Sequence, residues 1–111
     1  MAHAPATVPV MLRHVVVFTW KPGTSAESLA DLRAGLAALP GQIPEIRAYS
    51  FGDDAGMAAG NEAFAVVADF DDEAGWRSYA THPSHVEVLD GLVRPIRARR
   101  HAVQFHCDEP A

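Results

Sequence analysis

The sequence predicts one α+β domain with the element order β-α-β-β-α-β and a four-stranded antiparallel sheet. Four short runs are rich in β-branched and aromatic residues, which is typical of strands. Between them lie stretches whose apolar residues recur at spacings of three and four, which is typical of amphipathic helices. The chain has 111 residues, enough for a single domain.

The N-terminal half predicts a strand, a helix and a second strand. Residues 1–9 are rich in alanine and proline and are expected to form a flexible arm, so that the domain spans residues 10–107 and residues 108–111 form a tail. The first strand covers residues 13–20 (RHVVVFTW) and ends at Lys21-Pro22-Gly23.

A capping box made by Thr24 and Glu27 predicts the start of the first helix. Pro40-Gly41 and Pro44 predict its end. The apolar stripe of this helix consists of Leu29, Leu32, Leu36 and Leu39.

Two further strands are expected at residues 46–52 and 64–70, joined by a loose loop at 53–61. Acidic residues 71–73 then cap a short helix, in which Trp76 and Tyr79 lie three apart and share one face.

Pro83 restarts the helix after a break at Thr81-His82, and Pro95 ends it near Arg94. The last strand is expected at residues 101–107. The helix that Pro83 restarts has an apolar stripe made of Val86, Leu89, Val93 and Ile96. The complete order is the split βαβ plan of ferredoxin-like domains.

The two strands expected at the centre of the sheet are apolar on both faces. In a strand, alternate residues point to opposite faces, and the helices of this plan cover only one of them. The residues on the covered side would be His14, Val16, Phe18, Trp20, Phe64, Val66, Ala68 and Phe70. The other side carries Val15, Val17, Ala65 and Val67. The apolar character of this second face predicts a homodimer, in which a second copy of the chain covers it. The alternative is a partly exposed sheet, in which these valines serve only as strand formers.

Composition excludes several partners. The net charge of −5 argues against nucleic acid and against an anionic membrane surface. The basic cluster of Arg94, Arg97, Arg99 and Arg100 is interpreted as a solvated helix end. Cys107 is the single cysteine, so no intrachain disulfide is expected. The sequence shows neither a signal-like N-terminus nor a long apolar run, which favours a cytoplasmic location.

Three segments carry a family resemblance: RHVVVFTWKPG, NEAFAVVADFDD and, most specifically, YATHPSHVEV. They resemble the stress-responsive dimeric α/β-barrel (Dabb) family over about residues 12–107. The resemblance implies a ferredoxin-like monomer whose sheet closes into a barrel with the sheet of a second copy.

The resemblance also implies candidate site residues. One plant member, a polyketide cyclase, closes a linear chain by aldol condensation, and its catalytic Tyr and two His match Tyr79, His85 and His14 here. Some relatives hold a cation through backbone carbonyls, near Pro40 and Ile43 in this chain. Such carbonyl sites leave no side-chain signature, so no ion is predicted.

The residues themselves support acid–base chemistry, because histidine titrates near neutral pH. His85 would be the base, Tyr79 would orient it or donate a hydrogen bond, and His14 would place a polar substrate group. The alternative is that His85 and Tyr79 staple the helix restart and that His14 is a satisfied core histidine.

Three more residues are assigned to substrate binding: Trp76, Phe18 and His82. Trp76 could instead belong to the core and His82 could be a helix cap. No metal site and no cofactor are predicted, since His82 and His85 lack a third ligand and the chain has no glycine-rich phosphate loop.

The leading hypothesis is a homodimer that binds a small, mostly apolar organic molecule and acts on it by cofactor-free proton transfer. A non-catalytic stress or assembly protein is the alternative. A third hypothesis, a flavin-free monooxygenase, has no residue that singles it out.

Overall fold

The computed structural model describes residues 10–108, and the predicted arm at 1–9 and all but the first residue of the predicted tail lie outside this range. The elements are β1 (Met11–Trp20), α1 (Ala26–Gln42), β2 (Ala48–Asp53), β3 (Phe64–Phe70), α2 (Glu73–Thr81), α3 (Pro83–Val88), a π-helical turn η1 (Leu89–Val93) and β4 (Arg97–Cys107). The strands form one antiparallel sheet in the order β2-β3-β1-β4. The ferredoxin-like fold class is therefore confirmed.

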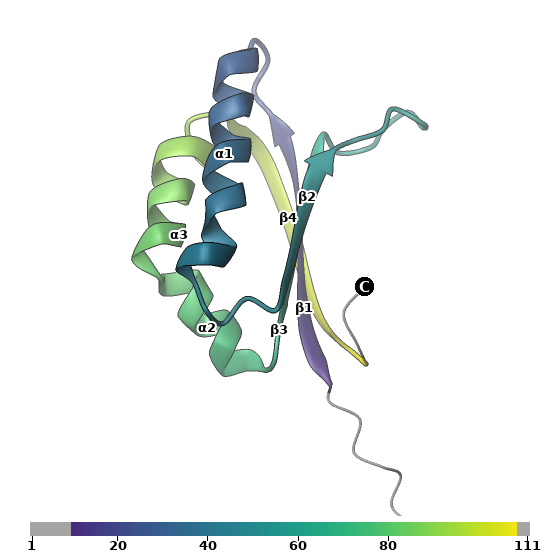
Figure 1. The fold of residues 1–111 in the computed structure, drawn as a ribbon. Coiled ribbons are helices and arrows are strands. Elements are labelled where there is room, and N and C mark those ends of the chain that lie inside the picture. Colours follow the sequence, from purple (N-terminus) through teal and green to yellow (C-terminus); the bar gives the residue numbers. More distant parts are fainter. Residues whose placement is uncertain (1–9, 109–111) are drawn as a thin grey trace, which may run out of the picture.

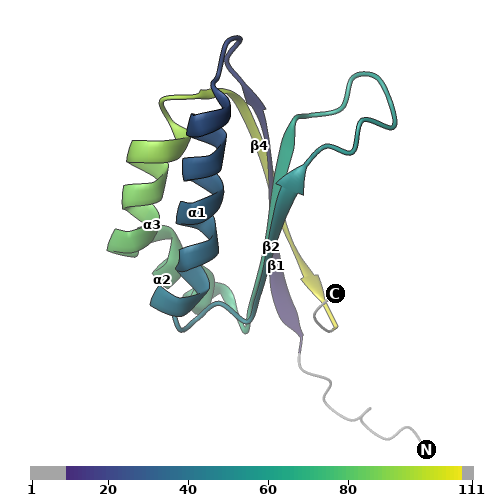
Figure 2. The ribbon, with the colours of Figure 1, turned by 45° about the horizontal axis from the view of Figure 1, so that its top comes forward.

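Among the described residues, all the helices lie on one face of the sheet, and none of them lies over the other face (Figure 1). The second view shows the same two layers, with the β2–β3 loop projecting on the side away from the helices (Figure 2). Within residues 10–108, no helix is long and apolar enough to cross a membrane.

The core lies between the two layers. Along β1 the even-numbered residues from Leu12 to Phe18 are buried, and along β3 Phe64, Val66, Ala68 and Phe70 are buried. This is the alternation that the sequence predicts for the helix-covered face. From α1, the leucines at 32, 36 and 39 complete the core.

The start and the end of α1 differ from the sequence prediction. The N-cap is Ser25, whose hydroxyl accepts a hydrogen bond from the backbone N–H of Ser28 at 3.0 Å, so the predicted Thr24–Glu27 capping box is wrong. The hydroxyl of Thr24 instead donates to the carbonyl of Lys21. Pro40 lies inside the last turn, and the helix continues because the N–H of Ile43 still reaches the carbonyl of Leu39 at 2.9 Å.

The last helical segment also differs from the prediction in its phase. Val86 is exposed, and Val88 is buried in its place. The chain then winds into η1, where the N–H of Arg94 donates to the carbonyl of Leu89 five residues back, at 2.9 Å. A π turn rotates the following residues relative to an α-helix, and so it interrupts a spacing of three and four.

Strand boundaries were predicted within a few residues, with one larger error. β2 begins at Ala48 rather than at residue 46, and β4 begins at Arg97 rather than at residue 101. The extra residues of β4 pair with the end of β1, where the register shifts so that Thr19 faces Arg99 but Trp20 faces Arg97. This irregularity, a β-bulge, has consequences for the site described below.

Candidate functional site

A cavity of about 280 Å³ lies between the helical layer and the sheet. Its apolar walls come from both layers: Val16, Phe18, Leu32, Leu36, Val66, Val88, Leu89 and Val93. Its polar lining consists of His14, Tyr49, Tyr79, His85, Arg94, Arg97 and Arg100. Apolar walls with convergent polar groups are typical of small-molecule sites, whose volumes are usually about 300–1,000 Å³, so this cavity suits a small ligand.

His14 enters the cavity from β1 and is buried. The side-chain amide Nε2 of Gln104, on the neighbouring strand β4, lies 2.8 Å from His14 Nδ1. An amide nitrogen can only donate, so Nδ1 accepts and the ring proton sits on Nε2. Burial lowers the pKa of His14 from 6.5 to about 4, with a smaller contribution from Arg100, and the ring is therefore neutral at pH 7.

His85 enters from α3 and has the opposite tautomer. Its Nδ1 lies 3.2 Å from the backbone carbonyl of Ala80, and because a carbonyl can only accept, Nδ1 donates. Burial lowers the pKa of His85 below its ordinary value, although the hydrogen bond to Ala80 opposes this. At neutral pH the ring is therefore uncharged, with a basic lone pair on Nε2.

Tyr79 lies next to both histidines. Its ring centroid is 4.1 Å from that of His85 and 6.2 Å from that of His14. Its hydroxyl is 3.2 Å from the hydroxyl of Tyr49 on β2. Burial raises the pKa of Tyr79 and of Tyr49, so both phenols stay protonated and can donate hydrogen bonds at pH 7.

Tyr49 and Gln104 are site residues that the sequence analysis missed. Each lies on a strand far along the chain from the Tyr79–His85 segment, and neither belongs to the segment that carries the family resemblance. The alternation within each strand is the one available signal, because it places Tyr49 and Gln104 on the same face of the sheet as His14.

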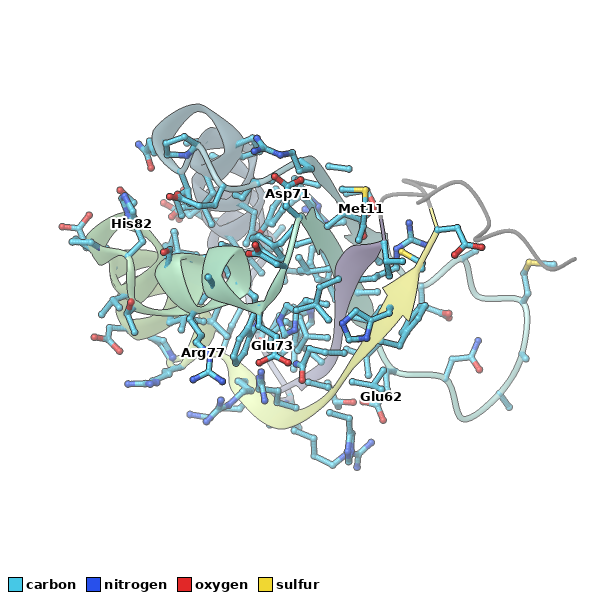
Figure 3. All side chains as sticks on the ribbon, turned by 90° about the horizontal axis from the view of Figure 1, so that it is seen from below. Met11, Glu62, Asp71, Glu73, Arg77 and His82 are labelled. Carbon is cyan, nitrogen blue, oxygen red and sulfur yellow. The ribbon has the colours of Figure 1, made fainter. Side chains whose placement is uncertain are left out.

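Of the three residues assigned to substrate binding, one lines the cavity and two do not. Phe18 lines the cavity. Trp76 does not, but its ring lies 6.1 Å from that of His14 and packs at the edge of the core. His82 is the N-cap of α3, where its Nδ1 accepts from the N–H of Ser84 at 3.1 Å, and it lies at the outer edge of the helical layer, away from the sheet (Figure 3).

The interpretation of the arginine cluster as a solvated helix end was right for the exposed Arg94, at the end of η1, and wrong for the other three arginines. Arg97, Arg99 and Arg100 belong to β4, because this strand begins four residues earlier than predicted. Arg94, Arg97 and Arg100 line the cavity, whereas Arg99 pairs with Glu62. Across residues 10–108, no group of three or more His, Cys, Asp or Glu side chains is placed to hold a metal ion.

Chemically, the cavity presents a basic imidazole nitrogen, an imidazole N–H, two phenols and guanidinium groups beside apolar walls. A base facing hydrogen-bond donors in such surroundings can accept a proton from an acidic C–H group while the donors stabilise the negative charge that develops.

Solved structures with the same fold include a protein of unknown function and an enzyme. A dimeric ferredoxin-like protein of unknown function from Thermobifida fusca YX is 38% identical with a TM-score of 0.82, over 96% of this chain and 100% of that one. A hydroxynitrile lyase from Passiflora edulis is 20% identical with a TM-score of 0.80, over 93% of this chain and 98% of that one.

Sequence comparison agrees with this likeness. The stress-response A/B barrel domain-containing protein HS1 of Arabidopsis thaliana is 27% identical over 78 residues, which are 68% of this chain and 72% of that protein. The model of the Stress responsive A/B Barrel Domain (Dabb) family matches residues 12–107, the same range over which the sequence resembles this family. The chain is therefore a member of the stress-responsive A/B barrel domain family.

Proposed function

We propose that this protein binds a small, mostly apolar organic molecule in the cavity and catalyses cofactor-free proton transfer on it. The observation that carries the proposal is the convergence of His14, Tyr79 and His85 on one cavity, with the two imidazoles held in opposite tautomers. His85 thus offers a base and His14 a donor, and neither needs to be charged.

The proposed step is the removal of a proton from carbon. A C–H bond next to a carbonyl breaks, the proton moves to Nε2 of His85, and the electron pair becomes an enolate whose oxygen accepts hydrogen bonds. Tyr79 donates one of these bonds, with Tyr49 supporting its hydroxyl, and Nε2–H of His14 donates another. Aldol cyclisation begins with such a species, and retro-aldol cleavage ends with one.

The other predicted residues have supporting roles in this proposal. Phe18 forms part of the apolar wall. Trp76 contributes to ligand binding indirectly by packing beside His14, and His82 by capping the helix that carries His85. The hydroxynitrile lyase relates to this proposal through fold alone, since function resides in the site rather than in the fold.

The reaction can be tested with 5-nitrobenzisoxazole, a small planar probe. Removal of its ring C–H proton breaks the N–O bond and releases a coloured phenolate, which reports proton transfer directly. We expect saturable turnover by the wild type and a loss of about 10²–10⁴-fold in His85→Gln, because the amide cannot replace the imidazole base. Tyr79→Phe should cause a smaller loss.

The control is His106→Gln, which changes an exposed histidine outside the cavity and should leave turnover unchanged. The rate should rise with pH through an apparent pKa below 6.5 and then remain level, because the neutral His85 is the active form. Turnover no faster than that of free imidazole, or an unaffected His85→Gln, would reject catalysis and leave the non-catalytic alternative.

We further infer that the protein is a homodimer formed through the sheet face that the helices leave bare. On this face Val15 pairs with Val67 and with Val103, and Val103 is 55% exposed and Phe105 44% exposed in the single chain. Apolar surface of this extent is usually covered in soluble proteins. The relative from Thermobifida fusca is a dimeric protein, which supports this inference.

Sedimentation equilibrium at micromolar concentration tests the dimer. The wild type should sediment as a dimer, and Val103→Lys as a monomer, because the new charge would be buried at the interface without a partner. Val86→Lys makes the same change at an exposed position on α3 and should stay dimeric. A monomeric wild type would overturn the inference.

A further inference from the structure

The solvent-exposed part of the cavity lining is cationic. Of the lining residues, Arg94 and Arg100 alone are exposed, and Arg97 is half-buried beside them. The opening of the cavity to solvent is therefore lined by positively charged arginines, although the net charge of the chain is −5. Such a local reversal of sign favours a negatively charged ligand group at this opening.

Most arginines of the chain are ion-paired. The chain has eight, all within residues 10–108, and six form salt bridges there: Arg13, Arg33, Arg47, Arg77, Arg94 and Arg99. Eight minus six leaves Arg97 and Arg100, for which no carboxylate of the described chain is in reach. Both line the cavity.

The β-bulge explains how both side chains reach the same cavity. Arg97 and Arg100 are three residues apart, and in a regular strand such residues point to opposite faces. Here the register shift pairs Arg100 with Phe18 and Arg97 with Trp20, two residues of the helix-covered face. Bulges commonly redirect a side chain next to a functional site.

We propose that the ligand of this cavity is an organic carboxylate with an apolar body, whose acid group pairs with Arg97 and Arg100. This inference rests on the proposed binding function and names the class of its substrate. Guanidinium groups match the planar geometry of a carboxylate, and the volume of about 280 Å³ leaves room for a small apolar body between α1 and the sheet.

The position of Arg100 also connects the anion to the reactive groups. Its charge lowers the pKa of His14, of His85 and of Tyr79, so its field reaches all three. A carboxylate bound there would partly neutralise that field. The base His85 would then become more basic when the ligand is in place.

Calorimetric titration with 3-phenylpropanoate and with 3-phenylpropan-1-ol tests the inference, because the two probes share a body and differ in charge. The wild type should bind the acid about 10-fold or more tightly than the alcohol, as expected for charge-assisted hydrogen bonds. Added salt should weaken binding of the acid and not of the alcohol.

Arg97→Gln with Arg100→Gln should abolish the preference for the acid, and unchanged affinity for the alcohol would show that the cavity is intact. Arg99→Gln, the matched control on the same strand, should keep the preference. Equal affinity of the wild type for both probes, or a preference that survives in the double variant, would overturn this inference alone. Binding of neither probe, together with no turnover of 5-nitrobenzisoxazole, would reject the proposed function as well.

Discussion

The two cavity histidines show how single hydrogen bonds set the chemistry of a residue. Gln104 donates to His14 and Ala80 accepts from His85, so a buried and a half-buried ring, both neutral, differ in which nitrogen carries the proton. A buried imidazole resists protonation because its charged form would lose hydration. The same burial that prepares His85 as a base therefore makes stability depend on pH.

We predict that His14 makes the protein lose stability in mild acid. Its pKa is about 4 in the folded state and about 6.5 in the unfolded state, so between these values the unfolded chain binds a proton that the folded chain does not. The free energy of unfolding should therefore fall by about 3 kcal/mol from pH 6.5 to pH 4 because of this residue. Urea unfolding at fixed protein concentration across this range measures it.

The informative comparison is between the wild type and His14→Gln, each with its free energy of unfolding measured as a function of pH. His14→Gln should remove most of this dependence, whatever its effect on stability at pH 7, while contributions from carboxylates cancel in the comparison. His106→Gln, at an exposed position, is the control. Parallel profiles for the wild type and His14→Gln would contradict the assignment of a buried neutral ring.

At the scale of elements, the turns and caps position the site. The cap at His82 starts α3, which carries His85, and the π turn η1 follows it and presents Leu89, Val93 and, at its C-terminal end, Arg94 to the cavity. On the opposite layer, the bulge in the β1–β4 pair places two arginines on one face. Both the π turn and the bulge thus bring side chains into the cavity lining.

We predict that the observed cap of α1, and not the capping box, stabilises the start of this helix. Ser25→Ala should lower the free energy of unfolding by about 1 kcal/mol, because the N–H of Ser28 loses its acceptor. Glu27→Ala should cost only a few tenths of a kcal/mol, from its favourable position near the helix N-terminus. Denaturant unfolding of the two variants distinguishes these roles, and the reverse order would restore the capping box.

At the scale of the whole molecule, the sheet has one face covered by helices and one that no helix of residues 10–108 covers. The bare face is not uniformly apolar, since Arg13 and Asp69 form a bidentate ion pair across β1 and β3, at 2.7 and 2.9 Å, with Asp69 2% exposed. A paired charge within an apolar interface can restrict the register in which two copies fit.

If folding and dimerisation are coupled, thermal stability must depend on concentration. We predict that the Tm of the wild type rises as protein concentration increases from about 1 to 100 µM, because mass action stabilises the associated state. Differential scanning calorimetry measures this shift. Val103→Lys should show a lower Tm that is independent of concentration, and a concentration-independent wild type would contradict coupled folding.

The strands, the helices and their order could be predicted from the sequence because they depend on local patterns. Alternation in residues 13–20 and 64–70 and the leucine spacing of α1 follow from the geometry of each element alone. The family was also recognisable, because its most specific motif, from Tyr79 to Val86, is a single continuous segment that can be read without knowing the fold. From these patterns the trio of His14, Tyr79 and His85 could be selected as candidates.

What only the tertiary structure decided depends on contacts between distant segments. The tautomers of His14 and His85 depend on Gln104, 90 residues away from His14, and on one backbone carbonyl. Three arginines were misplaced because β4 begins four residues earlier than predicted. Arg97 and Arg100 share a face because of a bulge, which is a mismatch between two strands that neither strand contains by itself. Local sequence thus determined the elements and the candidate residues, whereas packing determined protonation and which cations reach the cavity.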